Sequence, residues 1–377
     1  MIMKDKANDY LVISVVSLYF ISNFIGFSYY LIFGCSLISL LLSSCIGKRE
    51  NKSIVILSVY AVSFSLIAFQ IMLSQVLYIR IDVPHSTLAY IASLVFSMLL
   101  YMAGIRLSSI LIGIVVGGVL NSSMILIEMA QNGWGVLRTV GGKSEVNSVA
   151  LLQSLSFVSV YLLYRMRKVT GFITILILSV FAISVFMTGS RSGVVSLITV
   201  FTIMFFLEKD NYLKFNTLIK VTLVGIPVLY FLGDIIFGFI DANIQYLLNR
   251  FFEPNSGDTA SLMSRWDEVL LAFDFITENP IVIIIGTFPG YTDNFFWSQY
   301  IEYIRIHNTY VAMIVENGVL SIFLLLFFPL YAIRYKLNFY FLLLIPIILS
   351  SMAIYSLYLM PIFVVITSSV LRYDDIK

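Results

Sequence analysis

The chain has 377 residues, of which 60% are hydrophobic and only 12% are charged, and its mean hydropathy is +0.97. This balance excludes an ordinary soluble domain and indicates an all-α protein that crosses a membrane many times. The formal net charge of +2 is too small to indicate nucleic-acid binding, and two cysteines are too few for a disulfide framework or a cysteine metal site.

Apolar runs long enough to cross a bilayer follow one another along most of the chain. The first begins after Asp9 and has no small-residue cleavage site, so it is expected to remain as a membrane anchor. About twelve transmembrane helices are predicted, with a large helical exterior loop between the ninth and the tenth. The predicted helices cover residues 10–27, 29–46, 53–77, 87–104, 107–128, 147–164, 169–188, 192–207, 217–240, 309–332, 338–354 and 356–372.

The positive residues fall unevenly on the two sides of the membrane that this helix order defines. With the N-terminus in the cytosol, sixteen of the 23 lysines and arginines face the cytosol and seven face outward. This distribution obeys the positive-inside rule, so both termini are predicted to be cytoplasmic. Six of the seven outward cations are arginines, whose planar guanidinium group binds carboxylate or phosphate through two parallel hydrogen bonds.

One outward arginine lies in the stretch Gly189-Ser190-Arg191-Ser192-Gly193, between two apolar runs. A cation beside hydrocarbon costs free energy unless it reaches the interface or meets an anion. The glycines let the backbone approach a ligand closely, and the amides that start the next helix would add donors for a phosphate. Two interpretations stay open, since Arg191 either binds an anionic group or only extends to the interface at a helix turn.

The exterior segment of residues 241–308 is long enough to be a small domain between two membrane parts, residues 1–240 and 309–377. Within it, apolar residues recur at intervals of three and four over residues 261–279, which predicts an amphipathic helix. Such a helix is expected to lie along the outer face of the membrane.

Specific roles are predicted for four residues of this helix and for the proline that follows it. Ser264 and Asp267 have the spacing of a capping box, and Pro280 ends the helix. Trp266 is expected at the level of the lipid headgroups. Arg265 is either a ligand for an anion or an ordinary surface charge on the helix.

The exterior loop ends at His307-Asn308-Thr309-Tyr310, directly before a predicted helix that contains Glu316. An imidazole, with an unperturbed pKa of about 6.5, takes up and releases a proton near neutral pH, so His307 is a candidate general base. Alternatively, Asn308 or Thr309 caps the helix and His307 is a polar interface residue. Glu316 is a costly isolated carboxylate in a membrane helix, so it either orients His307, pairs with an arginine or makes a structural hydrogen bond.

The candidate motifs follow one another on the predicted outer side of the membrane. GSRSG comes first, then Ser264-Arg265-Trp266 and a turn around Asn279-Pro280 and Gly286, then His307-Asn308-Thr309-Tyr310 and Glu316-Asn317-Gly318. Their order and spacing resemble the bacterial O-antigen polymerase and O-antigen ligase superfamily. The resemblance covers roughly residues 185–325 in motifs and the whole chain in helix number. One departure is the segment 281–290, which separates the glycines that the family places close together.

The resemblance implies a membrane glycosyltransferase that moves a glycan from undecaprenyl diphosphate to an acceptor hydroxyl, on the outer face of the bacterial inner membrane. The departing diphosphate is negative, and a metal or fixed cations must neutralise it. The exterior loops contain no carboxylate pair of the Asp-x-Asp kind, so a reaction without metal or cofactor is expected, and its single displacement would invert the anomeric configuration. The resemblance assigns Arg191 and Arg265 to the diphosphate and His307 to the acceptor proton. The residues expected to bind substrate are Arg250, Arg305, Ser190, Ser192, Asn308, Glu316, Trp266 and Tyr310.

The acceptor separates the two branches of this superfamily. A polymerase joins one lipid-linked glycan to the terminal sugar of another, whereas a ligase delivers the finished glycan to a lipid A core. The compact loop has no additional basic surface for a phosphorylated core, so a polymerase is preferred, with a chain-length regulator and a flippase as candidate partners. A flippase or transporter is a third hypothesis, although transporters place ionisable residues near the membrane midplane and these charges cluster on one face.

Overall fold

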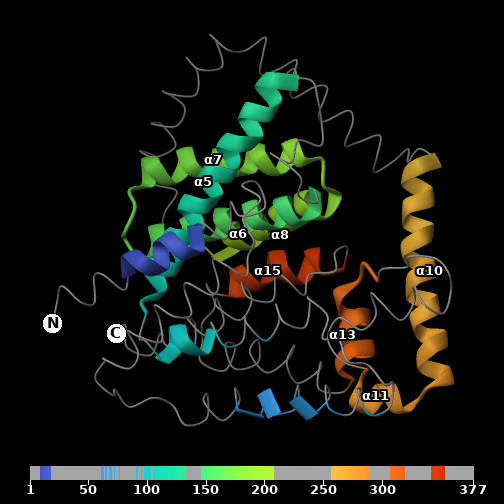
Figure 1. The fold of residues 1–377 in the computed structure, drawn as a ribbon. Coiled ribbons are helices and arrows are strands. Elements are labelled where there is room, and N and C mark those ends of the chain that lie inside the picture. The colour runs from blue at the N-terminus through green and yellow to red at the C-terminus, as the bar shows by residue number, and fades with distance from the viewer. Residues whose placement is uncertain are drawn as a thin grey trace. The chain divides into compact units, whose positions relative to one another are not determined.

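The computed structural model describes residues 9–17, 105–132, 146–207, 256–287, 306–318 and 341–352, and helical positions scattered between residues 61 and 102. All regular structure in these ranges is helical, as Figure 1 shows. Three of the described helices are long and apolar enough to cross a membrane. The all-α class is therefore confirmed, whereas the predicted total of twelve helices includes segments outside the described residues.

The chain divides into two compact units that each combine distant segments. The first unit contains residues 1–29, 108–258 and 342–350, and the second contains residues 30–107, 259–341 and 351–377. The segment of residues 241–308, expected to be one exterior loop, therefore contributes residues to both units. Arg191 belongs to the first unit, while Arg265 and His307 belong to the second.

The first unit holds the three candidate membrane spans. These are α5 (Leu107–Asn132), α6 (Val146–Arg165) and α7 (Gly171–Thr188), followed by α8 (Arg191–Leu207) and, late in the chain, α15 (Phe341–Ser350). All five lie where the hydropathy of the sequence predicts helices, and the first four agree with the predicted ranges to within four residues at each end.

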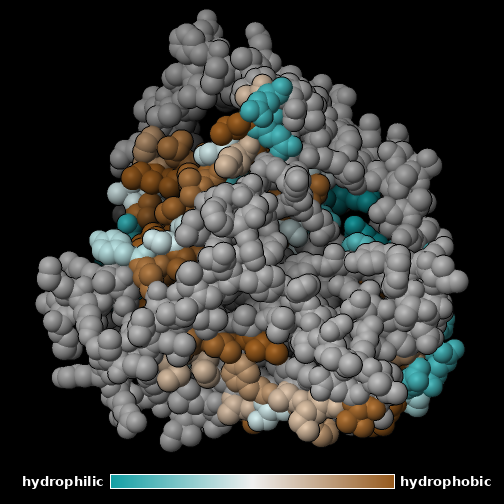
Figure 2. Space-filling view, viewed as in Figure 1, coloured by the Kyte–Doolittle hydropathy of each residue, from teal (hydrophilic) through white to brown (hydrophobic). Residues whose placement is uncertain are grey.

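The helices of the first unit differ in how much of their apolar surface is covered. α6 packs against α7 and α8, and its residues from Val149 to Leu163 are buried. α7 instead leaves Phe172, Ile173, Leu176 and Ile183 exposed, which Figure 2 shows as a hydrophobic area over this helix. A contiguous apolar face on a long helix is stable against lipid and costly in water, so α7 has the character of a lipid-facing span.

Polar side chains join α5, α6 and α7 inside this apolar bundle. The Ser122 hydroxyl donates to Gln153 Oε1 at 3.0 Å, and the Ser184 hydroxyl donates to Ser122 Oγ at 2.9 Å. Gln153 in turn donates to the carbonyl of Gly118 at 3.3 Å. A Cβ atom at Gly118 would collide with the side chain of Ser156, so the glycine is what lets α5 approach α6. Small residues and interhelical hydrogen bonds are the usual means of packing helices in a membrane.

The second unit contains α10 (Ser256–Glu278, except its first three residues), α11 (Ile281–Ile285) and α13 (Thr309–Asn317). α10 ends before Pro280 as predicted, but it begins five residues before the predicted start at residue 261. Ser264 therefore lies inside the helix, and the predicted capping box with Asp267 is wrong. The preceding segment contains the good helix formers Ala260, Leu262 and Met263, which carry the helix back to Ser256.

A short helix, α11, occupies the segment where the family's glycines are spread apart. It begins directly after Pro280 and ends at Gly286, whose φ of 68° lies in the region that favours glycine. Ile281–Ile285 thus forms a single helical turn between the end of α10 and Gly286.

Candidate functional site

α10 has one buried face and one exposed face in the second unit. Glu268, Ala272, Phe275 and Ile276 are buried. The exposed face carries Trp266, Leu270 and Phe273, and exposed isoleucines continue it on α11, visible as a hydrophobic area in Figure 2. The spacing of three and four grouped Ile276 with Trp266 in one apolar stripe, but Ile276 is buried while Trp266 is exposed. Trp266 is 60% exposed, and its position at the lipid headgroups stays a prediction.

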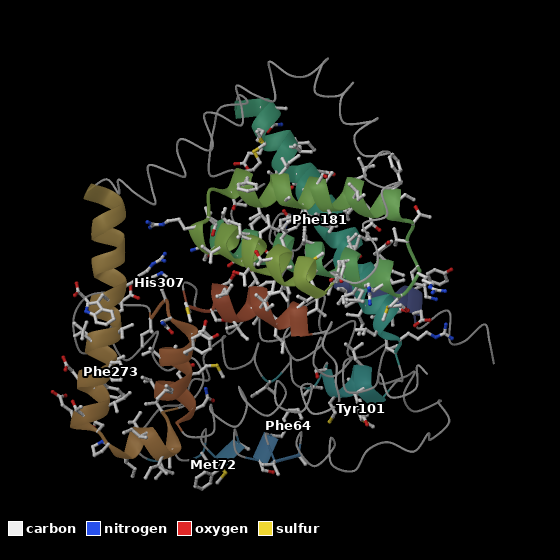
Figure 3. All side chains as sticks on the ribbon, turned by 180° about the vertical axis from the view of Figure 1, so that it is seen from behind. Phe64, Met72, Tyr101, Phe181, Phe273 and His307 are labelled. Carbon is white, nitrogen blue, oxygen red and sulfur yellow. The ribbon has the colours of Figure 1, made fainter. Side chains whose placement is uncertain are left out.

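The buried face of α10 binds the histidine that precedes α13. His307 Nδ1 lies 3.0 Å from both carboxylate oxygens of Glu268, and the His307 backbone N–H donates to Glu268 Oε2 at 2.9 Å. The Glu268 side chain is 8% exposed and the His307 side chain 35% exposed. Figure 3 shows His307 beside α10. One carboxylate thus holds both the ring and the main chain of His307.

The residue after His307 caps the start of α13. Asn308 is the N-cap, and its side-chain oxygen accepts from the backbone N–H groups of Tyr310 at 3.0 Å and Val311 at 3.2 Å. The next residue, Thr309, donates its N–H to the carbonyl of Ser351 at 2.9 Å. Three consecutive residues are therefore tied down by hydrogen bonds, so the backbone that carries the imidazole is well positioned.

α13 is also braced at its far end, where it meets α11. The Thr287 N–H donates to the carbonyl of Val315 at 2.9 Å, and its hydroxyl donates to the same carbonyl at 3.2 Å. Two glycines make this approach possible: a Cβ at Gly286 would collide with the Glu316 carbonyl, and a Cβ at Gly318 would lie 2.7 Å from the Gly286 nitrogen. Since α11 follows α10 after Pro280, this contact fixes α13 relative to the helix that carries Glu268.

Arg265 lies on the same helix as Glu268, three residues earlier. Residues three apart on an α-helix are neighbours on its surface, separated by about 4.5 Å along the axis. Arg265 is partly exposed. Within the second unit, a guanidinium group and a carboxylate-bound imidazole therefore share one end of the buried face of α10.

Glu316, one candidate for orienting His307, lies in the last turn of α13 and is fully buried. The carboxylate that binds His307 Nδ1 is instead Glu268. No local sequence pattern marked Glu268, because it lies 39 residues from His307 and was hidden among the residues of an amphipathic helix. Its charge at a position that faces the protein interior was the one available clue.

In the first unit, the GSRSG stretch forms the turn between α7 and α8. Gly189, at φ 61°, ends α7 in the left-handed conformation and donates its N–H to the Phe186 carbonyl at 3.0 Å. Gly193 lies against α6, where an added Cβ would come within 2.5 Å of the Ala150 Cβ. Both glycines are thus required by the fold, independently of any ligand.

The serines of this turn surround Asn147, near the start of α6. Ser190 Oγ donates to Asn147 Oδ1 at 2.7 Å and accepts from the Gly193 N–H at 3.2 Å, which makes Ser190 the cap of α8. Ser192 Oγ lies 3.1 Å from Ser190 Oγ and 3.5 Å from Asn147 Oδ1. Ser190 is buried and its hydroxyl is occupied in the fold, so a role in holding the turn accounts for it fully.

Arg191 is the first residue of α8 and is partly exposed. Its position, between two serines that the fold holds in place, agrees with the expected helix start. Its assignment to a diphosphate stays a prediction. Of the other expected substrate ligands, Asn308 and Tyr310 are partly exposed beside His307, while Arg250 and Arg305 lie outside the described residues.

Comparison with known protein families identifies the region that holds these residues. A family model described as O-antigen ligase matches residues 172–326, a span that includes Arg191, Arg265 and His307. This match supports the likeness of the region to the O-antigen polymerase and ligase superfamily. No curated protein and no solved structure matches the chain. The match of the family model confirms the resemblance inferred from the motifs.

The match to the O-antigen ligase family over residues 172–326 gives the described geometry a chemical context. Members of this family are membrane enzymes of the glycosyltransferase type. The matched span begins in α7 and continues through α8, α10, α11 and α13. The pair of His307 and Glu268, with Arg265 close by on α10, therefore lies within the family's domain and has the residue types that a group transfer needs.

Proposed function

We propose that the protein is a surface-polysaccharide polymerase, which transfers a glycan from undecaprenyl diphosphate to the terminal sugar hydroxyl of another lipid-linked repeat. The observation that carries this proposal is the contact between His307 and Glu268, one helical turn from Arg265. A transfer of this kind needs a base for the acceptor hydroxyl and a cation for the leaving group. The second unit supplies both residue types within a short stretch of α10 and the start of α13.

In this proposal His307 Nε2 accepts the proton of the acceptor hydroxyl as the hydroxyl oxygen bonds to the anomeric carbon. The bond between that carbon and the diphosphate oxygen breaks on the opposite side, and its electron pair leaves with the diphosphate. Arg265 binds the departing anion, and Arg191 is assigned the same role from the family resemblance. One displacement inverts the anomeric configuration, and the reaction uses no cofactor.

An O-antigen ligase is the second candidate, because the matching family model carries that description. A ligase would use the same leaving group and the same base, and it would differ only in the acceptor, a lipid A core. The two functions therefore share the geometry around His307 and are separated by their products.

The proposal is tested by expressing the full chain in a bacterial strain that lacks its own polymerase and examining the surface glycan by gel electrophoresis. A ladder of repeats is expected. A shift of preformed lipid-linked polymer onto lipid A would establish the ligase instead. Accumulation of untranslocated precursor in the absence of the chain would identify a flippase and overturn both enzyme proposals.

The variant His307→Ala in the same strain tests the base. Loss of the ladder is expected, with unchanged protein level and unchanged binding of the lipid-linked donor. A ladder of normal intensity from this variant would show that the base is another residue.

A further inference from the structure

Glu268 is a buried carboxylate on α10, a helix on which the acidic residues Asp267, Asp274 and Glu278 are exposed. The residue as a whole is 7% exposed, and the hydrogen bonds described for its carboxylate all go to one residue, His307. Burial of a charge is costly unless the charge is paired and hydrogen-bonded. The fold therefore retains an expensive group at this position and uses it to hold an imidazole.

The geometry determines which ring nitrogen carries the proton when the imidazole is neutral. An ionised carboxylate only accepts hydrogen bonds, and Nδ1 lies 3.0 Å from both of its oxygens. Nδ1 must therefore be the protonated nitrogen, which leaves the lone pair on Nε2. In many catalytic sites a carboxylate binds one ring nitrogen of a histidine and orients the imidazole, so that the other ring nitrogen acts as the base.

The main-chain contact makes this arrangement more than an ion pair on the surface. The His307 N–H donates to the same carboxylate, and the next residue caps α13. The ring is therefore held more firmly than a side chain on an unrestrained loop. Its partly exposed position keeps it within reach of a substrate hydroxyl. Positioning of this kind contributes to rate by holding the base near its reactive geometry.

We propose that Glu268 is the positioning residue of His307: it fixes the Nδ1–H tautomer, aims Nε2 at the acceptor, and stabilises the imidazolium that forms on proton transfer. This inference rests on the proposed function of His307 as the base. The proton passes from the acceptor hydroxyl to Nε2 and then to solvent, while Glu268 stays ionised throughout.

The first experiment observes the tautomer directly and needs no catalysis. The chain has two histidines, so the full-length protein with His85→Gln, ¹⁵N-labelled at histidine and placed in lipid nanodiscs, gives the ring nitrogens of His307 alone. At an alkaline pH, where the ring is neutral, we expect Nδ1 to carry the proton. In Glu268→Ala the Nε2–H form should become populated. A wild-type ring protonated at Nε2 would overturn the inference.

The second experiment separates positioning from stability. Glu268→Gln keeps the size of the side chain but removes its charge, and it permits the amide to donate to Nδ1 and favour the wrong tautomer. The kcat of glycan transfer should fall at least about tenfold, since general-base catalysis contributes roughly 10²–10⁴-fold. The KM for the lipid-linked donor and the protein level should stay unchanged. Glu278→Gln, an exposed carboxylate on the same helix, is the matched control and should transfer normally.

The outcomes distinguish this inference from the function on which it rests. If His307→Ala abolishes transfer but Glu268→Gln and Glu268→Ala transfer at the wild-type rate, the positioning role is wrong and the base assignment survives. If His307→Ala transfers normally, the base assignment itself fails, whatever the tautomer. A fall in protein level and melting temperature with unchanged kcat would reduce Glu268 to a structural residue.

Discussion

At the scale of single residues, the described chain uses its polar groups for two different purposes. Ser190 and Asn308 are both candidate substrate ligands, yet each has its side-chain oxygen engaged in capping a helix. Arg265 and His307 lie in the second unit at partly exposed positions, and Glu268 is the buried group that connects His307 to α10. The residues with exposed polar groups are therefore the stronger candidates for chemistry.

The choice of arginine over lysine is testable at Arg265. Arg265→Lys keeps the positive charge but loses the planar fork that binds two phosphate oxygens together. We expect glycan transfer to fall about tenfold or more, because a charge-assisted hydrogen bond contributes roughly 1.5–3 kcal/mol. The ladder assay measures this. Arg165→Lys, at an exposed position on α6, is the control, and equal activity of the two variants would contradict a bidentate role for Arg265.

The cap of α13 gives a second prediction at this scale. Asn308→Ala removes the acceptor for two backbone N–H groups, so the protein should be destabilised by about 0.5–2 kcal/mol. Asn308→Asp keeps the acceptor and should melt near the wild type. Thermal unfolding in detergent measures both. If Asn308→Asp is stable but inactive, the amide nitrogen contacts substrate in addition to the cap.

At the scale of elements, the second unit is organised by how α11 joins α10 to α13. Gly286 and Gly318 bring the short helix α11 (Ile281–Ile285) directly against the end of α13. The start of α13 is held separately by Asn308, and by Glu268 from α10. Among the described helices, α10 and α13 hold the imidazole directly, and α11 joins the far end of α13 to α10.

Gly286 carries the prediction for this junction. Gly286→Ala places a side chain at φ 68° and drives its Cβ into the Glu316 carbonyl, so the strain of about 1–3 kcal/mol adds to a steric collision. We expect a lower melting temperature and loss of transfer through displacement of α13. Gly171→Ala is the control, because its Cβ would lie 3.6 Å from the Tyr164 ring, an ordinary contact. A fully stable and active Gly286→Ala protein would show that the junction is not needed.

At the scale of the whole molecule, the distribution of charges along the sequence predicts which side of the membrane each segment occupies. The exposed stripe of Trp266, Leu270 and Phe273 and the exposed isoleucines of α11 give the second unit a surface that suits the membrane interface. The positive-inside rule predicts that α10 lies on the outer side of the membrane and that the turn after α6 lies in the cytosol.

This topology is tested by labelling single cysteines in intact cells. In a chain from which Cys35 and Cys45 have been removed, Glu278→Cys should react with a membrane-impermeant maleimide added from outside, and Lys168→Cys should react only after the membrane is opened. Both positions are exposed, so reactivity reports the side of the membrane. The reverse pattern would place α10 in the cytosol and remove the basis for an outward-facing enzyme.

Much of the fold and part of the site follow from the sequence by itself. The membrane class, the bounds of α5 to α8, the end of α10 at Pro280 and the family all come from hydropathy, helix period and motif order, which depend on residues close together in the chain. The predicted start of α10 at residue 261 was five residues late, and Ser264 and Asp267 have the spacing of a capping box although both lie inside the helix.

Only the tertiary structure decided which carboxylate meets His307. The two residues lie 39 positions apart, and the contact depends on the packing of α10 beside the start of α13. The hydrogen bond between Ser190 and Asn147, which lie 43 positions apart, could not be predicted from the sequence either. Side-chain partners of this kind are selected by packing and by the cost of leaving a buried charge or hydroxyl unsatisfied, and neither leaves a periodic pattern in the chain.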